Sequence, residues 1–137
     1  MRVLILHDAP RAGSRADELD ALEQARVVAA ALAELGHEPR SFGVGLDLAA
    51  LEAEIAAVRP ALAFNLVESL AGHGRLIAVV PQLLDALGIP YAGCPAQAIH
   101  ATSGKLLAKE RLETAGLPTP AWLTARDLAQ GAGALVF

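Results

Sequence analysis

The chain has 137 residues, of which 54% are hydrophobic and 19% charged, and its net charge is −4. This composition excludes intrinsic disorder, and the length corresponds to one domain or to one domain and a fragment. Charged residues interrupt every apolar run before it reaches the ~18 residues of a spanning helix, and the sequence contains neither a basic stripe nor an aromatic platform for nucleic acid. We therefore expect no membrane or nucleic-acid partner. The single cysteine, Cys94, excludes an internal disulfide framework, which favours a cytoplasmic protein.

The first half of the chain alternates between strand and helix patterns. Its apolar spacing predicts three strands, over 2–7, 38–44 and 61–67, and two helices, over 17–35 and 48–58. Val3, Leu4, Ile5 and Leu6 form a continuous apolar run, as in a strand that is covered on both faces. Asp47 is placed to be the N-cap of the second helix, and Gly36 is placed to end the first.

The second half continues the alternation with shorter elements. We expect a helix over 75–87, with Pro81 in its first turns or at a kink, and a strand over 89–92. Two further helices are expected, one from Pro95 to Ala101 and one that is capped by Ser103 and runs to Ala115. A short strand is expected at Trp122 and Leu123. Such alternation predicts an α/β fold with a parallel sheet between helices. Residues 134–137 look like half of a strand after a turn at Gly131 and Gly133, so we expect two parts, 1–117 and the start of a truncated second domain at 118–137.

Polar residues gather in three loops that would follow strands, 8–17, 68–75 and 93–95. In open parallel sheets, ligands bind at the carboxyl ends of the strands. Asp17 and Glu18 lie near the start of the long helix, where they either stabilise the helix dipole or bind a cationic ammonium group. The two alternatives stay open at this point.

Glu68 is the most informative residue of the second loop. A carboxylate near the end of a buried strand is costly unless it is paired or faces a cleft. The structural explanation is an ion pair with Arg75 or a backbone contact, and the functional one is substrate binding. His73, between Gly72 and Gly74, is either an acid–base group or a solvent-facing loop histidine.

Lys105 follows Gly104 at the expected start of a helix. The pair does not form a phosphate-binding loop of the Walker type, because the first glycine and the Ser or Thr after the lysine are both missing. A lysine charge opposes the dipole at this end of a helix, which favours either a phosphate partner or a simply exposed side chain. We expect the single cysteine, Cys94, to be a small buried residue, and no histidine and carboxylate spacing predicts a metal site.

Three segments in series carry a family resemblance. They read LGIPYAGC over 87–94, SGKLLAK over 103–109 and AGLPTPAW over 115–122, and FNLVE over 64–68 precedes them in the same order. Together they resemble the D-alanine–D-alanine ligase family of ATP-grasp enzymes. The resemblance covers essentially the whole chain.

The resemblance implies a three-layer α/β/α, Rossmann-like pre-ATP-grasp domain, followed by the beginning of the ATP-grasp domain. Members of the family join a carboxylate to an amine through an acyl-phosphate, with ATP and Mg²⁺. Lys105 then matches the lysine that reaches the ATP phosphates, and Asp17 or Glu18 falls near the acid that holds the ammonium of the first amino acid. An amino-acid or peptide substrate and a homodimer are further expectations from the resemblance.

The chain also departs from the family pattern. The glycine-rich loop after the first strand is replaced by residues 7–15, and the motif after the third strand is replaced by the region around Glu68. The remaining ATP and Mg²⁺ ligands of the family would lie beyond Phe137, so we expect no catalytic residue within this chain and no activity of the chain alone. The alternative is a free-standing, non-catalytic α/β module that binds a ligand or a protein.

Overall fold

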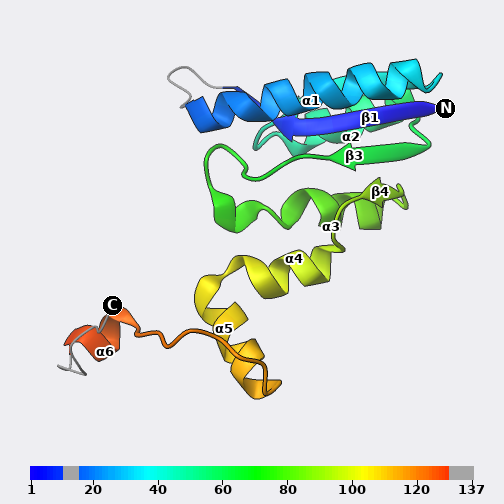
Figure 1. Cartoon of the computed structure of the whole chain (residues 1–137). Coiled ribbons are helices and arrows are strands. Elements are labelled where there is room, and N and C mark those ends of the chain that lie inside the picture. Colours follow the sequence, from blue (N-terminus) through cyan, green and yellow to red (C-terminus); the bar gives the residue numbers. More distant parts are fainter. Residues whose placement is uncertain (11–15, 130–137) are drawn as a thin grey trace. The chain divides into compact units, whose positions relative to one another are not determined.

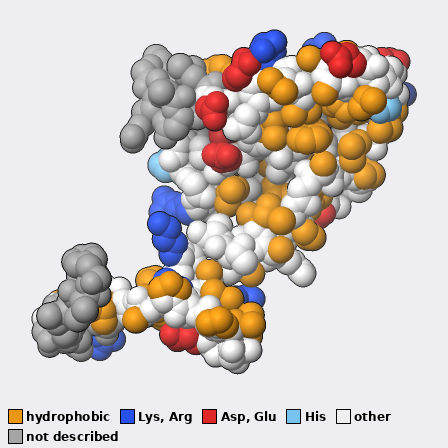
Figure 2. All heavy atoms as spheres, in the orientation of Figure 1, with side chains coloured by type: hydrophobic (Ala, Val, Ile, Leu, Met, Phe, Trp, Pro, Cys, Tyr) orange, Lys and Arg blue, Asp and Glu red, His pale blue; other side chains and the backbone are white. Residues whose placement is uncertain are grey.

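The computed structural model describes residues 1–10 and 16–129 (Figure 1). They belong to two compact units, which we call unit 1, Met1–Ser103, and unit 2, which begins at Gly104. Hydrophobic side chains reach the surface of both units (Figure 2). None of the described helices combines the length and the apolar composition of a membrane span. The domain boundary expected after residue 117 stays a prediction.

Unit 1 alternates strands and helices as the sequence predicts. In chain order its elements are β1 Arg2–Asp8, α1 Ala16–Glu34, β2 Glu38–Val44, α2 Leu48–Val58, β3 Leu62–Asn65, the 3-10 turn η1 Gly74–Leu76, α3 Val79–Ala86, β4 Tyr91–Ala92 and α4 Ala96–Ser103. The helix expected over 75–87 is therefore divided into η1 and α3. Pro81 is the third residue of α3, where its missing N–H interrupts no intrahelical hydrogen bond.

The described part of the sheet has the strand order β2-β1-β3-β4, and all of its strands are parallel. The chain moves one way from β1 to β2 and then back past β1 to β3 and β4. Because crossover connections are right-handed, this reversal places α1 on one face of the sheet and both α2 and α3 on the other. The predicted three-layer, Rossmann-like α/β fold is confirmed.

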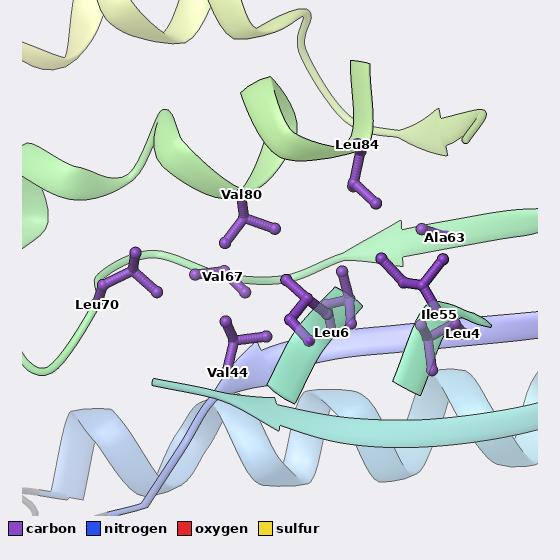
Figure 3. Packing of buried hydrophobic residues seen from close by; sticks show 10 residues of the cluster. Leu4, Leu6, Val44, Ile55, Ala63, Val67, Leu70, Val80 and Leu84 are labelled. Carbon is purple, nitrogen blue, oxygen red and sulfur yellow. The ribbon is translucent and has the colours of Figure 1, made fainter. Parts of the chain in front are cut away.

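Both faces of β1 are buried, as its continuous apolar run predicts. Leu4 and Leu6 point toward α2 and α3, while Val3 and Ile5 point the opposite way. The main core lies on the α2 and α3 side of the sheet (Figure 3), and it consists of Leu4, Leu6, Val44, Leu51, Ile55, Ala63, Val67, Leu70, Val80 and Leu84. On the other side, Ala21 and Ala25 are buried on α1, which packs against β1 and β2.

Local signals set the ends of α2. The side chain of Asp47 accepts a hydrogen bond from the N–H of Ala50 at 3.1 Å, which confirms the predicted N-cap. Arg59 ends the helix with a left-handed backbone, and its N–H donates to the carbonyl of Ile55 at 2.8 Å. Pro60 follows and prevents the helix from continuing.

Unit 2 contains α5, Lys105–Thr114, and α6, Ala125–Ala129, joined by an extended connector over 117–124. Gly116 has a φ of +67° and ends α5, with N–H groups of Gly116 and Leu117 donating back to Glu113 and Leu112. The Nζ of Lys109 donates to the carbonyl of Pro120 at 2.8 Å and to Oγ1 of Thr119 at 3.2 Å. These bonds hold the connector along α5.

Three local expectations are wrong. Ser103 is the last residue of α4, and Gly104 is the N-cap of α5 without any side-chain hydrogen bond. Trp122 and Leu123 form no strand, because this segment pairs with no strand among the described residues and Nε1 of Trp122 donates to Glu113. Cys94 is exposed and not buried, because β4 ends at Ala92 and leaves it outside the sheet. The turn and strand expected over 131–137 lie outside the described residues.

Candidate functional site

The carboxyl ends of β1 and β3 lie side by side at the point where the strand order reverses. This reversal is where ligands bind in open parallel sheets. Asp8 is the last residue of β1 and Asn65 is the last residue of β3. The candidate site therefore begins with these two residues and continues into the loop over 66–73.

The carboxylate of Asp8 joins the two strand ends. Its Oδ2 accepts the N–H of Glu68 at 3.2 Å, and its Oδ1 accepts both the N–H and the hydroxyl of Ser69, at 3.0 and 3.2 Å. Asn65 adds a local contact, because its Oδ1 accepts the N–H of Val67 at 3.3 Å. The loop after β3 is thus held to the end of β1 by hydrogen bonds to a charged group, which are stronger than neutral ones.

The same loop continues into a tight turn over 70–73. The N–H of His73 donates to the carbonyl of Leu70 at 3.0 Å, and Leu70 is buried in the core. Ala71 and Gly72 between them have φ values of +50° and +77°. Glycine adopts this backbone region freely, but alanine does so at a cost of about 1 kcal/mol. Strain of this kind is often found at functional sites.

Glu68 and His73 both lie in this loop with exposed side chains. Among the described residues, Glu68 makes no ion pair with Arg75, so that structural explanation of the carboxylate is not supported. The backbone contact is present, since the Glu68 N–H binds Asp8. The carboxylate itself is exposed at the edge of the sheet formed by the carboxyl ends of the strands.

The other candidate residues are placed as follows. Asp17 and Glu18 fall in the first turn of α1, and their side chains lie outside the part that the structure describes. Lys105 is the first residue of α5, is exposed and belongs to unit 2. No group of three or more His, Cys, Asp or Glu among the described residues is arranged to hold a metal ion.

The start of α5 fits a phosphate. Gly104 has no side chain to cap the helix, so the N–H groups of its first turn are open to an anion. The exposed ammonium of Lys105 adds a positive charge at the same end.

The third loop expected at a ligand site, 93–95, borders a hollow of about 420 Å³ beside β4. The hydroxyl of Tyr91 accepts the N–H of Ala96 there at 3.2 Å. Burial raises the pKa of Tyr91 above its usual value, with a further rise from Asp85 and an opposing effect of the Ala96 hydrogen bond.

Sequence reasoning missed Asp8 and Ser69. A carboxylate directly after a buried strand was a usable signal for Asp8, of the same kind that singled out Glu68. Ser69 had no such signal, because its partner lies 61 residues away in the sequence.

No protein family model matches the chain. Three curated proteins are similar to it, and all are D-alanine–D-alanine ligases. The one from Moorella thermoacetica is 33% identical over 74% of this chain and 31% of its own length. Those from Oleidesulfovibrio alaskensis and Aquifex aeolicus are 35% and 33% identical, each over 90% of this chain, and over 37% and 39% of their own lengths. The chain thus matches about a third of the length of these relatives, between 31% and 39%.

Proposed function

We propose that this chain, a D-alanine–D-alanine ligase-like amino-terminal region, forms the substrate-binding part of an ATP-dependent carboxylate–amine ligase. The observation that carries the proposal is the similarity to three such ligases over as much as 90% of the chain. The position of the Glu68 loop at the reversal of strand order supports it.

Each candidate residue has a role in this proposal. The exposed carboxylate of Glu68 binds the ammonium group of an amino-acid or peptide substrate, together with Asp17 or Glu18. His73 lies three residues past the buried Leu70 and contacts the same substrate. Lys105 and the uncapped start of α5 bind an ATP phosphate.

When bound, ATP with Mg²⁺ supplies the phosphoryl group that activates the carboxylate as an acyl-phosphate. In this proposal the residues of this chain bind and orient the amino substrate and a phosphate. Because the chain matches only 31–39% of the length of the ligases it resembles, we expect the 137-residue chain alone to be inactive.

An isotope experiment on the protein at its natural length tests the reaction. When an amine displaces phosphate from an acyl-phosphate, one oxygen of the substrate carboxylate leaves with the phosphate. With ¹⁸O in that carboxylate, the proposal predicts one ¹⁸O in the inorganic phosphate, for D-alanine or for another amino acid or dipeptide that stimulates ADP release. ADP release without ¹⁸O transfer would contradict the acyl-phosphate. A binding module without catalysis, the alternative expected from the sequence, would release no ADP with any amine.

Two variants separate the two binding roles. Glu68→Gln keeps the side-chain shape and removes the charge, so KM for the amino substrate should rise about tenfold, with KM for ATP unchanged. Lys105→Ala should give the opposite pattern. If both variants change the same KM, or if Glu68→Gln changes only stability, the assigned roles are wrong.

A further inference from the structure

The backbone around Asp8 is fixed on both sides by the sheet. The N–H of Ala9 donates to the carbonyl of Val44 at 2.9 Å, so the chain still follows β2 after β1 ends. On the other side, the N–H of Leu66 donates to the carbonyl of Leu6 at 2.8 Å, which keeps the chain after β3 alongside β1. The backbone that carries the Asp8 carboxylate is therefore held in place on both sides.

Both carboxylate oxygens of Asp8 are used within the protein. Oδ2 accepts the N–H of Glu68, and Oδ1 accepts the N–H and the hydroxyl of Ser69. These three bonds occupy three of the roughly four acceptor positions of the carboxylate. They hold the two residues that donate to it, Glu68 and Ser69.

The loop is anchored a second time, directly after Ser69. Leu70 is 1% exposed and belongs to the core, and the strained turn at Ala71 leads from it to His73. Glu68 thus has its own amide fixed by Asp8, and the two residues after it are fixed by Asp8 and by the core. Its carboxylate is exposed, but the backbone that carries it is held.

We propose that Asp8 is a positioning residue, which orients Glu68 and the turn to His73 for binding of the amino substrate. This role rests on the proposed ligase function. The carboxylate of Asp8 acts through the loop and does not touch the substrate. Removal of the Asp8 side chain should therefore raise KM for the amino substrate and leave binding of ATP unaffected.

Hydrogen exchange on the natural-length protein tests the contact itself. In Asp8→Ala, amides over 66–75 should exchange at least about tenfold faster than in the wild type, the effect of losing one hydrogen bond to a charged group. Asp47→Ala is the matched control, because it also removes a carboxylate that accepts a backbone N–H. It should speed exchange only at the start of α2. Unchanged exchange over 66–75 in Asp8→Ala would overturn the proposal.

Steady-state kinetics test the consequence. Asp8→Asn keeps the shape and one acceptor oxygen, so it tests the contact even if Asp8→Ala folds poorly. We expect KM for the amino substrate to rise about tenfold in Asp8→Ala and less in Asp8→Asn, with KM for ATP changed less than about twofold.

The outcomes are distinguishable. Faster exchange with unchanged KM would overturn the positioning role and leave the ligase function intact. A wild type without amine-dependent ADP release would overturn the ligase function, and the substrate role of Asp8 would fall with it.

Discussion

The forces that stabilise unit 1 differ from those that organise unit 2. Unit 1 has a core of ten buried residues from three strands, two helices and the loop after β3. In residues 104–126 of unit 2 no side chain is buried, and Leu106 and Leu117 are 49% and 53% exposed. The described part of unit 2 is organised instead by hydrogen bonds between α5 and the connector.

This difference divides the molecule's properties. Burial of apolar surface dominates folding stability, so the stability of the chain resides in unit 1. Polar contacts near the surface each contribute about 1 kcal/mol, so they fix the path of the connector but add little to the stability of the described residues. The first two of the four predictions below test this division, the other two concern unit 1 alone, and they run from the largest expected effect to the smallest.

The largest effect belongs to the core. Leu51 is fully buried on α2, and Leu51→Ala should lower the free energy of unfolding by about 2–5 kcal/mol because it leaves a cavity. The matched control is Leu106→Ala on the exposed α5, which should change it by less than about 0.5 kcal/mol. Urea denaturation measures both. Equal losses in the two variants would show that unit 2 also has a buried core.

The second effect belongs to the connector. Lys109→Met removes the two hydrogen bonds to Thr119 and Pro120 while it keeps a long side chain. We expect limited proteolysis within 117–124 to become several-fold faster, since about 1 kcal/mol of local protection per bond is lost. The urea midpoint should stay unchanged. A large shift of the midpoint would place Lys109 in the cooperative core instead.

The third effect is a small stabilisation. Ala71→Gly relieves the left-handed backbone at φ +50° in the loop of the candidate site. The free energy of unfolding should rise by about 0.5 kcal/mol, because the gain is partly offset by the greater freedom of glycine in the unfolded chain. Ala30→Gly, at an exposed position in the second half of α1, is the control and should destabilise by about 1 kcal/mol. A loss of stability in Ala71→Gly would mean that the alanine methyl group itself is needed.

The smallest effect concerns the edge of unit 1. Tyr91 is the only tyrosine, so absorbance near 295 nm reports its ionisation alone. Burial raises its pKa, and the midpoint should therefore lie above the ordinary value of about 10. Because the folded pKa is the higher one, this contribution to stability is complete below about pH 10 and is lost as the pH rises further. Tyr91→Phe should remove that part of the alkaline pH dependence, and a midpoint at or below the ordinary value would contradict the burial.

Sequence patterns were informative where the cause is local. The N-cap at Asp47 depends on a contact three residues away, and the end of α5 at Gly116 depends on one backbone conformation. The burial of both faces of β1 follows from a continuous apolar run. These features could be predicted without knowledge of the rest of the chain.

Long-range contacts were not predictable in the same way. Nothing in the residues around Asp8 indicates that its partners are Glu68 and Ser69. The short β4 exposes Cys94 because the sheet ends before it, and Trp122 binds Glu113 where its neighbours suggested a strand. In each case, tertiary context decided between conformations that the local sequence allows equally.

The central place of β1 has a consequence for the order of events during synthesis. β1 emerges from the ribosome before β3, with which it pairs, and Ser69 lies 61 residues after Asp8. At about 5–20 residues per second, the ribosome needs roughly 3–12 s to make that stretch. Until β3 has been translated, the edge of β1 that pairs with it stays open, and the site at the end of β1 exists only after the loop to His73 has been translated.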